Sequence, residues 1–573
     1  MADTKTLLAG RLQRAFDAVE PGADPMLRHS DRADYQANGV LALAKRLGRD
    51  PRELAEDIVA RAELADVCAA VEVSGPGFLN LTLDDSFVAR QLAEVAGDGR
   101  LGIEPTEHRE KVVVDYSAPN VAKEMHVGHL RTTVIGDALC RLLTFVGHAV
   151  VRENHVGDWG TPFGMLIEHL ADLGGETGLR ELSVGDLDTF YKEARQSFDA
   201  DESFAERSRR RVVLLQSGDE ETMRLWHVLV AESVAHFDEV YRRLGVLLTA
   251  DDVVGESFYN AQFPEVVAEL DSLGLLVENE GALCVFPPGF TNRSGDPLPL
   301  IVRKSDGGYG YAASDLATIR DRVGRLGTDL ILYVVGAPQA QHFQMCFAVA
   351  RLAGWLPEGA EAVHVAFGSI LGPDKKLLRS RSGESERLID LLDEAVRRAD
   401  AAIAERWPTV PAGQRAATAS AIGIGAVKYA DLSTERMRDY VFDWDRMLAS
   451  EGNTGPYLQY AHARICSIFR RGEVAPPPPE PPQLAEPAER ALALRLLGLH
   501  EAVEATLEAW SPSKLCAYLF DVATDFTTFY ERCPVLKAPD EATRRSRLFL
   551  SDVTARVLAL GLSLLGIEAP EHM

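Results

Sequence analysis

The chain has 573 residues, of which 46% are hydrophobic and 25% charged, and its formal net charge is -26. At roughly 150 residues per domain, this length predicts about three or four domains. The composition is close to the average of globular proteins, which excludes wholesale disorder and a fibrous repeat. Without an apolar run of about 20 residues or a signal-peptide pattern, we expect a cytoplasmic protein that does not enter a membrane, and the acidic balance alone disfavours a nucleic-acid partner.

Residues 1–108 have the pattern of a small α+β domain. Apolar residues follow helical spacing from Leu7 to Val19 and again within 38–49. An alternating run at Val71 and Val73 comes next, followed by GPGFLNLTL at 75–83, where glycine and proline separate short strands. The sequence therefore predicts helices followed by a small sheet.

Buried-strand runs alternate with helices over residues 109–388. KVVVDYS at 111–117, an apolar helix pattern and HAVVREN at 148–154 form a βαβ unit, which predicts a Rossmann-like parallel sheet covered by helices. Charged amphipathic helices at about 168–245 are a predicted insertion. We expect the same sheet to resume at the runs LCVF (283–286), LIVRK (300–304), LILYVVG (330–336) and AVHVAFGSI (362–370).

Residues 389–573 are predicted to be helical only, with a stiff proline-rich connector at 474–487. The fold class is thus a multidomain α/β protein with an all-α C-terminal region. The seven cysteines lie far apart along the chain and form no close pairs, so we expect no structural zinc and no disulfide framework.

The strongest local signal is SAPNVAKEMHVGHLR at 117–131, between a strand and a helix. A helix N-terminus presents unpaired N–H groups and a positive dipole end, which suits a phosphate. His126 and His129, three residues apart, can donate to phosphoryl oxygens from one side, and Gly128 leaves room for a flat base. The dinucleotide, Walker and H-E-x-x-H patterns do not occur in this segment.

Several ordered segments resemble arginyl-tRNA synthetase, a class I aminoacyl-tRNA synthetase. His126 to His129 resembles the HIGH-type motif of that class. The resemblance implies ATP-dependent charging of tRNA(Arg) with L-arginine through an arginyl adenylate. The other matching segments are GPGF (75–78), NHVGDWGTPFGML (154–166), KYADLSTERMRDYVFDWDRML (428–448), EGNTGPYLQYAHAR (451–464) and the end LLGIEAPEHM (564–573).

The resemblance also implies roles for individual residues. Tyr311 and Asp315, spaced i, i+4 and so able to share a helix face, would hold the substrate guanidinium, which requires acceptors. Asp115, Asn120, Glu256 and Gln339 would lie near the substrate's α-amino end. ATP would contact Asn120, Lys123, His126, Gly128 and His129.

GPDKKLLRSRSGES at 372–385 resembles a divergent KMSKS loop, whose positive charge meets the leaving pyrophosphate. Lys376, Arg379 and Arg381 would act there, and this chain has Arg379-Ser380-Arg381 where relatives usually have Lys-Thr-Arg. Arginine keeps the charge without the compact geometry of lysine. Mg²⁺ is expected to enter with ATP, and the resemblance implies that bound tRNA assists the first step.

The C-terminal helices resemble the family's anticodon-binding domain, and the N-terminal domain resembles its tRNA-elbow domain. Candidate tRNA contacts are Tyr460, Arg464, Phe529 and Tyr530, although the three aromatic residues could equally belong to the core. A monomer is expected by resemblance alone.

Three other functions remain open at this point. A paralogue could deliver activated amino acid elsewhere, but it would be expected to lack the C-terminal helices. An inactive RNA-binding or regulatory protein would be expected to have lost the His pair or the carboxylates. A plain nucleotide-binding metabolic enzyme is disfavoured because both common phosphate fingerprints are absent.

Overall fold

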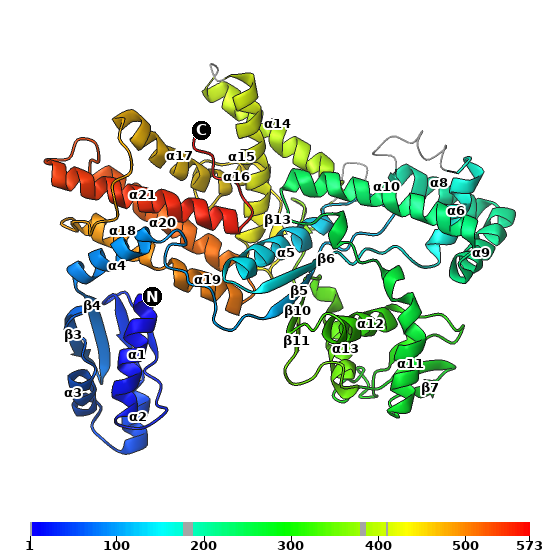
Figure 1. The fold of residues 1–573 in the computed structure, drawn as a ribbon, viewed down its shortest axis with the longest axis horizontal. Coiled ribbons are helices and arrows are strands. Elements are labelled where there is room, and N and C mark those ends of the chain that lie inside the picture. Colours follow the sequence, from blue (N-terminus) through cyan, green and yellow to red (C-terminus); the bar gives the residue numbers. More distant parts are fainter. Residues whose placement is uncertain (1–2, 176–186, 379–385, 408–410) are drawn as a thin grey trace.

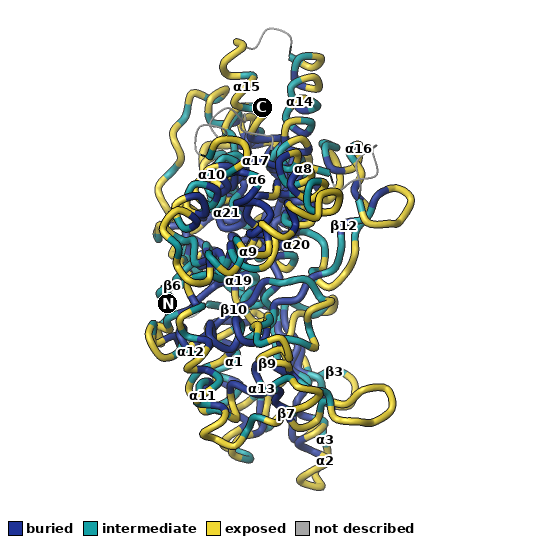
Figure 2. Tube along the Cα trace, turned by 90° about the vertical axis from the view of Figure 1, so that its right-hand side faces the viewer, coloured by how far each residue is buried: buried dark blue, intermediate teal, exposed yellow. Residues whose placement is uncertain are grey.

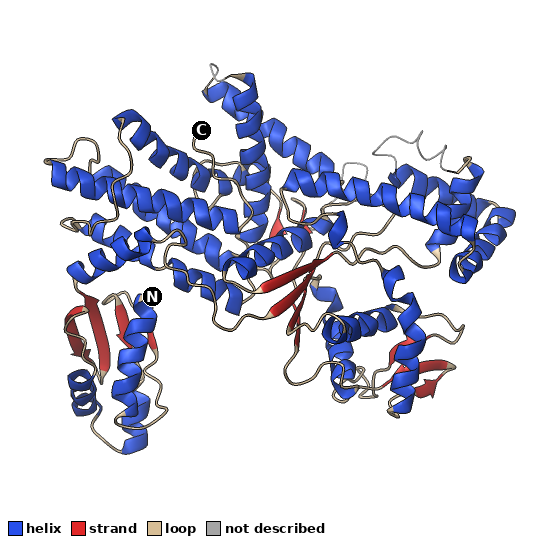
Figure 3. Cartoon of the chain, in the orientation of Figure 1, coloured by secondary structure: helices blue, strands red, loops and turns tan. Residues whose placement is uncertain are grey.

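A computed structural model describes residues 3–175, 187–378, 386–407 and 411–573. Figure 1 shows the N-terminal domain below the helical C-terminal region, with the central sheet beside them. Within these described ranges, strands occur in the N-terminal domain, the central sheet and two small sheets, and helices make up most of the rest (Figure 3). Among the described residues, no helix combines the length and apolar character needed to cross a bilayer.

The N-terminal domain is α+β, as predicted, and packs helices against an antiparallel four-stranded sheet of order β1-β2-β4-β3. Its first two strands, β1 and β2, lie between the predicted helices and were not predicted. Asp3, Asp50 and Asp84 cap three of its helices by accepting backbone N–H groups. Leu8 and Leu54 are fully buried in its core. The elements are α1 (Thr4–Asp17), β1 (Leu27–His29), β2 (Tyr35–Ala37), α2 (Val40–Leu47), α3 (Pro51–Arg61), β3 (Cys68–Ser74), β4 (Phe78–Leu83) and α4 (Asp85–Gly97).

The central sheet has four parallel strands in the order β11-β10-β5-β6, which confirms the predicted Rossmann-like core. Val112 and Val114 belong to one hydrophobic cluster and Val113 to another, so β5 is buried on both faces. Its strands are β5 (Lys111–Asp115), β6 (Ala149–Glu153), β10 (Leu330–Tyr333) and β11 (Glu361–His364), and helices α5 (Gly128–Phe145), α12 (Tyr311–Gly324) and α13 (Ala340–Leu352) pack around it.

The predicted place of residues 283–286 and 300–304 in the central sheet is wrong. They form a separate antiparallel sheet of β7 (Val277–Asn279), β8 (Ala282–Val285) and β9 (Leu300–Arg303). Glu280 and Gly281 both have positive φ, so a tight turn folds β8 back onto β7 before it could reach the central sheet.

The prediction of helices only beyond residue 388 needs a smaller correction. The two-residue strand β13 (Tyr440–Val441) pairs in parallel with β12 (Ile370–Leu371). So short a strand has no detectable periodicity. This pair joins the C-terminal region to the chain just before the KMSKS-like loop.

The insertion is helical, as predicted, and its described helices are α6 (Pro162–Asp172), α8 (Leu187–Ala200), α9 (Glu202–Ser217) and α10 (Glu220–Leu244). η1 (Ala250–Asp252), η2 (Glu256–Gln262) and α11 (Phe263–Ser272) follow it. Arg207 and Arg211 both pair with Glu168 at 2.8 Å. These two arginines of the insertion therefore stabilise its own helix packing.

The C-terminal region is a helical bundle interrupted by the proline-rich connector at 474–487. Figure 2 shows buried segments through the middle of the molecule and exposed residues on the outer loops. Its helices are α14 (Leu388–Arg406), α15 (Ala412–Leu432), α16 (Trp444–Met447), α17 (Gly455–Gly472), α18 (Pro487–Leu497), α19 (Leu499–Glu508), α20 (Ser513–Arg532) and α21 (Glu541–Leu564).

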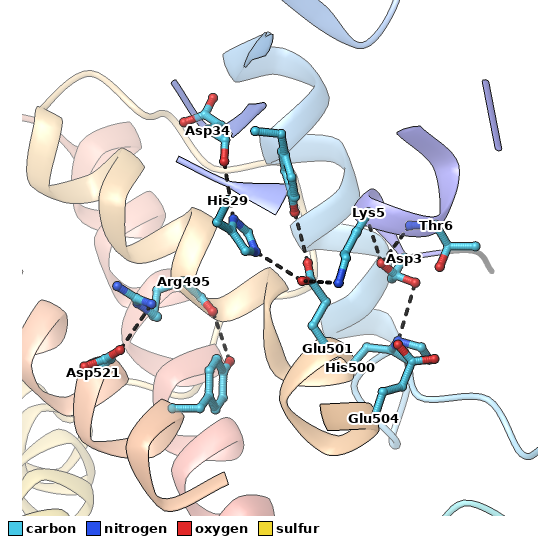
Figure 4. Close-up of polar contacts among 12 residues, drawn as sticks. Asp3, Lys5, Thr6, His29, Asp34, Arg495, His500, Glu501, Glu504 and Asp521 are labelled. Carbon is cyan, nitrogen blue, oxygen red and sulfur yellow. Dashed lines mark hydrogen bonds and ion pairs between the residues drawn. The ribbon is translucent and has the colours of Figure 1, made fainter. Parts of the chain in front are cut away.

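A partly buried carboxylate on α19, Glu501, fixes the N-terminal domain against these helices (Figure 4). Glu501 accepts a hydrogen bond from the Tyr35 hydroxyl at 3.1 Å. It also lies 3.1 Å from His29 Nε2 and 3.4 Å from Lys5 Nζ. Three side chains of the N-terminal domain thus converge on one anionic group.

Glu501→Ala should weaken the docking of the N-terminal domain by about 1.5–3 kcal/mol, because three polar partners lose a charged acceptor. Differential scanning calorimetry should show an earlier transition for this domain. Glu504→Ala is the matched control, since the Glu504 side chain is 55% exposed and its loss should cost well under about 1 kcal/mol. Equal shifts for the two variants would contradict this assignment.

Candidate functional site

The site lies at the carboxyl end of β5, where the sheet order changes direction. From β5 the chain continues through α5 to β6 on one side, while the other neighbour of β5 is β10. Ligands of open α/β sheets bind at such switch points. The loop after β5 has positive φ at Ser117, Ala118 and Ala122, a backbone path that side chains outside the loop hold in place. Backbone N–H groups of these residues donate to Thr132 Oγ1, Asn154 Oδ1 and Ser233 Oγ, each at 3.0 Å.

The two histidines of the HIGH-type motif stand side by side, with ring centroids 4.1 Å apart. His126 Nδ1 accepts the Gly128 N–H at 3.0 Å, and His129 Nδ1 accepts the His126 N–H at 3.1 Å. A neutral imidazole with an accepting Nδ1 carries its proton on Nε2. Both rings are therefore set to donate from Nε2.

Burial keeps both imidazoles neutral. It lowers the pKa of His126, and it lowers the pKa of His129 to about 3, with a further contribution from the neighbouring His126. Gly128 has no room for a side chain, because a Cβ would lie 2.7 Å from the His126 ring. The glycine thus lets the His126 ring fold over the start of α5, while its predicted role toward a base stays a prediction.

The HIGH-type motif is paired through its backbone with the segment that follows the KMSKS-like loop. The Val127 N–H donates to the Glu386 carbonyl, and the Leu388 N–H donates to the Met125 carbonyl, each at 2.9 Å. One end of the loop is thereby fixed beside the histidines.

The described part of the KMSKS-like loop ends in a short hairpin. The Leu378 N–H donates to the Ile370 carbonyl at 3.1 Å, and the Gly372 N–H donates to the Lys376 carbonyl at 2.7 Å. Lys376 is exposed. The other two predicted loop residues, Arg379 and Arg381, lie outside the described residues.

Two of the predicted arginine ligands, Glu256 and Asp315, belong to one anionic cluster. Burial raises the pKa of Glu256 to about 7, and the charges of Asp158 and Asp315 add to that rise. Asp158 accepts hydrogen bonds from the Ser257 N–H at 2.8 Å and its hydroxyl at 2.6 Å. The three carboxyl groups thus interact electrostatically, and such a group of acids suits a cation.

Asp158 was missed as a site residue, although it lies within the NHVGDWG segment that carries the family resemblance. Burial raises the pKa of Asp158 as well. The adjacent Gly157 has its own constraint, since a Cβ there would lie 2.3 Å from Asn120 Oδ1. Asn120 itself is exposed, which leaves the rest of its amide open to a ligand.

Asp115 is engaged inside the protein. Arg322, which is fully buried, places Nη2 at 2.7 Å from Asp115 and Nε at 2.6 Å from Glu153. Arg322 is a site residue that the sequence pattern did not single out. A signal existed, because the buried positions Leu316 and Ile319 of α12 lead one turn further to this arginine.

The remaining predicted substrate residues are more exposed. Tyr311 and Asp315 share α12, as their spacing predicts, and Tyr311 is 78% exposed at the first residue of that helix. Gln339 is exposed directly before α13. The Lys123 ammonium lies 4.7 Å from the centre of the Tyr191 ring, on the insertion.

The predicted tRNA contacts fall into two groups. Phe529 is fully buried and belongs to the core, one of the two alternatives left open by the sequence. Tyr460 is 36% exposed, and the Arg464 guanidinium lies 4.4 Å from the centre of the Tyr530 ring. Polar and aromatic atoms at the surface of the bundle therefore come from Tyr460, Arg464 and Tyr530.

Three family descriptions match successive parts of the chain. "Arginyl tRNA synthetase N terminal domain" matches residues 3–83, "tRNA synthetases class I (R), catalytic domain" matches 91–444, and "DALR anticodon binding domain" matches 458–573. An arginine–tRNA ligase of Thermobifida fusca is 55% identical over 578 residues, with 100% of both chains covered.

Two solved structures of arginyl-tRNA synthetases have the same fold over the full length of both chains. The Plasmodium falciparum structure has a TM-score of 0.86 at 29% identity. The Thermus thermophilus structure has a TM-score of 0.81 at 26% identity. The chain belongs to the arginyl-tRNA synthetase family.

Proposed function

We propose that the crevice at the end of β5 serves both steps of the chain's arginine–tRNA ligase reaction. That reaction activates L-arginine with ATP to arginyl adenylate and transfers it to the terminal adenosine of tRNA, releasing AMP and pyrophosphate. The observation that carries the proposal is a neutral, donating histidine pair on the segment after β5, whose backbone pairs with Gly157 beside Asp158 of the carboxylate cluster. The pair suits phosphate, and the cluster suits a guanidinium and an ammonium group.

In the first step the L-arginine carboxylate attacks the α-phosphorus of ATP. His126 and His129 donate Nε2–H groups to the phosphoryl oxygens as charge develops there, helped by the N-terminus of α5. Asn120, Lys123 and Gly128 complete the proposed ATP contacts. Lys376, Arg379 and Arg381 stabilise the leaving pyrophosphate.

The substrate is held from its two ends. Asp315 accepts guanidinium N–H groups, with Tyr311 beside it. Glu256, Gln339 and Asn120 bind around the α-amino group. Asp115 supports this end of the site indirectly, because its carboxylate is paired with Arg322.

Mg²⁺ is proposed to enter with the ATP phosphates. Among the described residues, the one group with spacing suited to a metal ion is Asp315, His342 and Cys346. Nitrogen and sulfur donors do not suit a hard cation such as Mg²⁺, which prefers oxygen ligands and keeps several waters. The bound ion would neutralise negative charge on the phosphates.

In the second step the terminal adenosine attacks the adenylate through its 2′-hydroxyl, so no protein nucleophile is needed. We assign the tRNA elbow to the domain at 1–108, the acceptor end to 109–388 and the anticodon to 389–573. Tyr460, Arg464 and Tyr530 are the proposed anticodon-side contacts. We also propose that the enzyme is monomeric and cytoplasmic.

ATP–pyrophosphate exchange with each of the twenty amino acids, with and without total tRNA, tests the proposal. Exchange confined to L-arginine and dependent on tRNA is the expected result. A His126→Ala, His129→Ala double variant should bind tRNA normally and lose exchange. Full exchange in that variant would refute the assignment of the crevice.

Arginine binding should strengthen as the pH rises through about 7. The substrate ammonium requires ionised Glu256, whose pKa is raised to about 7 by burial and two neighbouring carboxylates, so protonation at lower pH removes the attraction. KM for L-arginine should therefore fall between pH 6 and 8 in the wild type. In Glu256→Gln it should be high, and this part of its pH dependence should disappear. Glu278→Gln, an exposed control on β7, should retain the wild-type profile, and an unchanged slope in Glu256→Gln would contradict the prediction.

A further inference from the structure

Asp315 has a partner on the neighbouring helix that the reaction described above does not use. His342, in the first turn of α13, places Nε2 at 2.5 Å from Asp315 Oδ2. Cys346, one turn further along α13, places Sγ at 3.6 Å from the same nitrogen. Helices α12 and α13 lie side by side (Figure 1), so the pair joins two elements around the end of the substrate crevice.

We propose that His342 is a positioning residue that orients the Asp315 carboxylate for the guanidinium of L-arginine. The proposal rests on the role of Asp315 in the proposed function. Nε2–H donates to Oδ2, which leaves Oδ1 to accept from the substrate. A carboxylate held by one donor loses its rotational freedom before the substrate binds, and the same hydrogen bond raises the pKa of His342.

The burial of the three groups supports this assignment. The Asp315 and His342 side chains are 18% and 28% exposed, so each keeps part of its surface accessible. Cys346 is fully buried behind them. A substrate can thus reach Asp315 while the hydrogen bond to His342 persists.

A metal ion is the competing explanation for these three residues, and the geometry disfavours it. Two ligands of one tetrahedral ion lie roughly 3.3 Å apart, whereas Nε2 and Oδ2 are at hydrogen-bond distance, 2.5 Å. Burial and the nearby Asp315 charge raise the pKa of the Cys346 thiol well above its usual range. A protonated thiol is a poor metal ligand.

Three variants test the hydrogen bond by steady-state aminoacylation. His342→Leu should raise KM for L-arginine about 10-fold to 100-fold, as expected for a lost hydrogen bond to a charged group. KM for ATP and kcat should change about twofold or less. His342→Gln should restore most of the arginine affinity, because its amide N–H group reaches a position close to that of Nε2. A comparable rise of KM for both L-arginine and ATP would overturn the positioning role. So would a failure of His342→Gln to restore the arginine affinity.

A double-mutant cycle with Asp315→Asn separates this inference from the proposed function. If His342 acts through Asp315, the double variant Asp315→Asn, His342→Leu should bind L-arginine no more weakly than Asp315→Asn alone. Additive losses would refute the role of His342 and leave the pocket intact. An unchanged KM in Asp315→Asn would refute the pocket, and His342 with it.

Cobalt binding tests the metal explanation directly. The purified enzyme, freed of metals with a chelator and titrated with Co²⁺, should develop no thiolate-to-cobalt absorption. Cys346→Ser should retain the wild-type KM for L-arginine. A thiolate band that disappears in Cys346→Ser but persists in Cys284→Ser would show a metal site and overturn the proposal.

Discussion

Asp315→Asn should raise KM for L-arginine about 30-fold to 1000-fold while leaving KM for ATP nearly unchanged. The guanidinium carries five N–H donors and no acceptor, so it binds best to an ionised oxygen acceptor. Removing one partner of a buried charge pair costs about 2–5 kcal/mol. The proposed pocket concentrates this requirement on Asp315, one turn into α12.

The measurement is arginine-dependent pyrophosphate exchange at saturating ATP and tRNA. Asp271→Asn is the matched control, because Asp271 is an exposed carboxylate on α11 and should leave both KM values unchanged. The variant should also lose discrimination against amino acids that lack a guanidinium, since it no longer offers a charged acceptor. Equal rises of KM for L-arginine and ATP would point instead to a general disruption of the domain.

The sequence predicted those parts of the fold that depend on local pattern. The apolar runs at 112–114 and 330–333 became central parallel strands, because a strand buried on both faces requires continuous apolar residues. The runs at 283–285 and 300–303 look alike in composition, yet they form a separate sheet. The pairing of β8 with β7 depends on the turn at Glu280 and Gly281. The composition of a strand does not show which other strand it will pair with.

The same limit applies to the site. The motif residues His126 and His129 could be predicted because their chemistry is written in one continuous segment. The partners Asp158, Arg322 and His342 were missed, since each acts through a residue distant in the sequence. Long-range contacts of this kind become visible only when the helices have been placed.

His126→Ala and His129→Ala should each lower the rate constant of arginine activation about 100-fold to 1000-fold. This is the usual effect of removing one preorganised donor to a developing oxyanion. KM for both substrates should change little, because the donors act most strongly in the transition state. The double variant should lose less than the product of the single effects, since the His126 N–H bonds to His129 Nδ1 and the two rings act as a unit.

The pH dependence distinguishes neutral donors from cationic ones. With the pKa of His129 at about 3 and that of His126 also lowered, both imidazoles are neutral throughout the range near pH 7. Their Nε2–H donation should therefore not weaken as the pH rises through 6.5 to 8, and the rate constant of activation at saturating substrates should not decline over that interval. An imidazolium pair would lose its charge over that interval, and the rate constant would fall. His108→Ala, at an exposed histidine outside the crevice, should match the wild type at every pH. A decline that occurs in the wild type and in His108→Ala but is absent in His129→Ala would show that the pair acts as a cation.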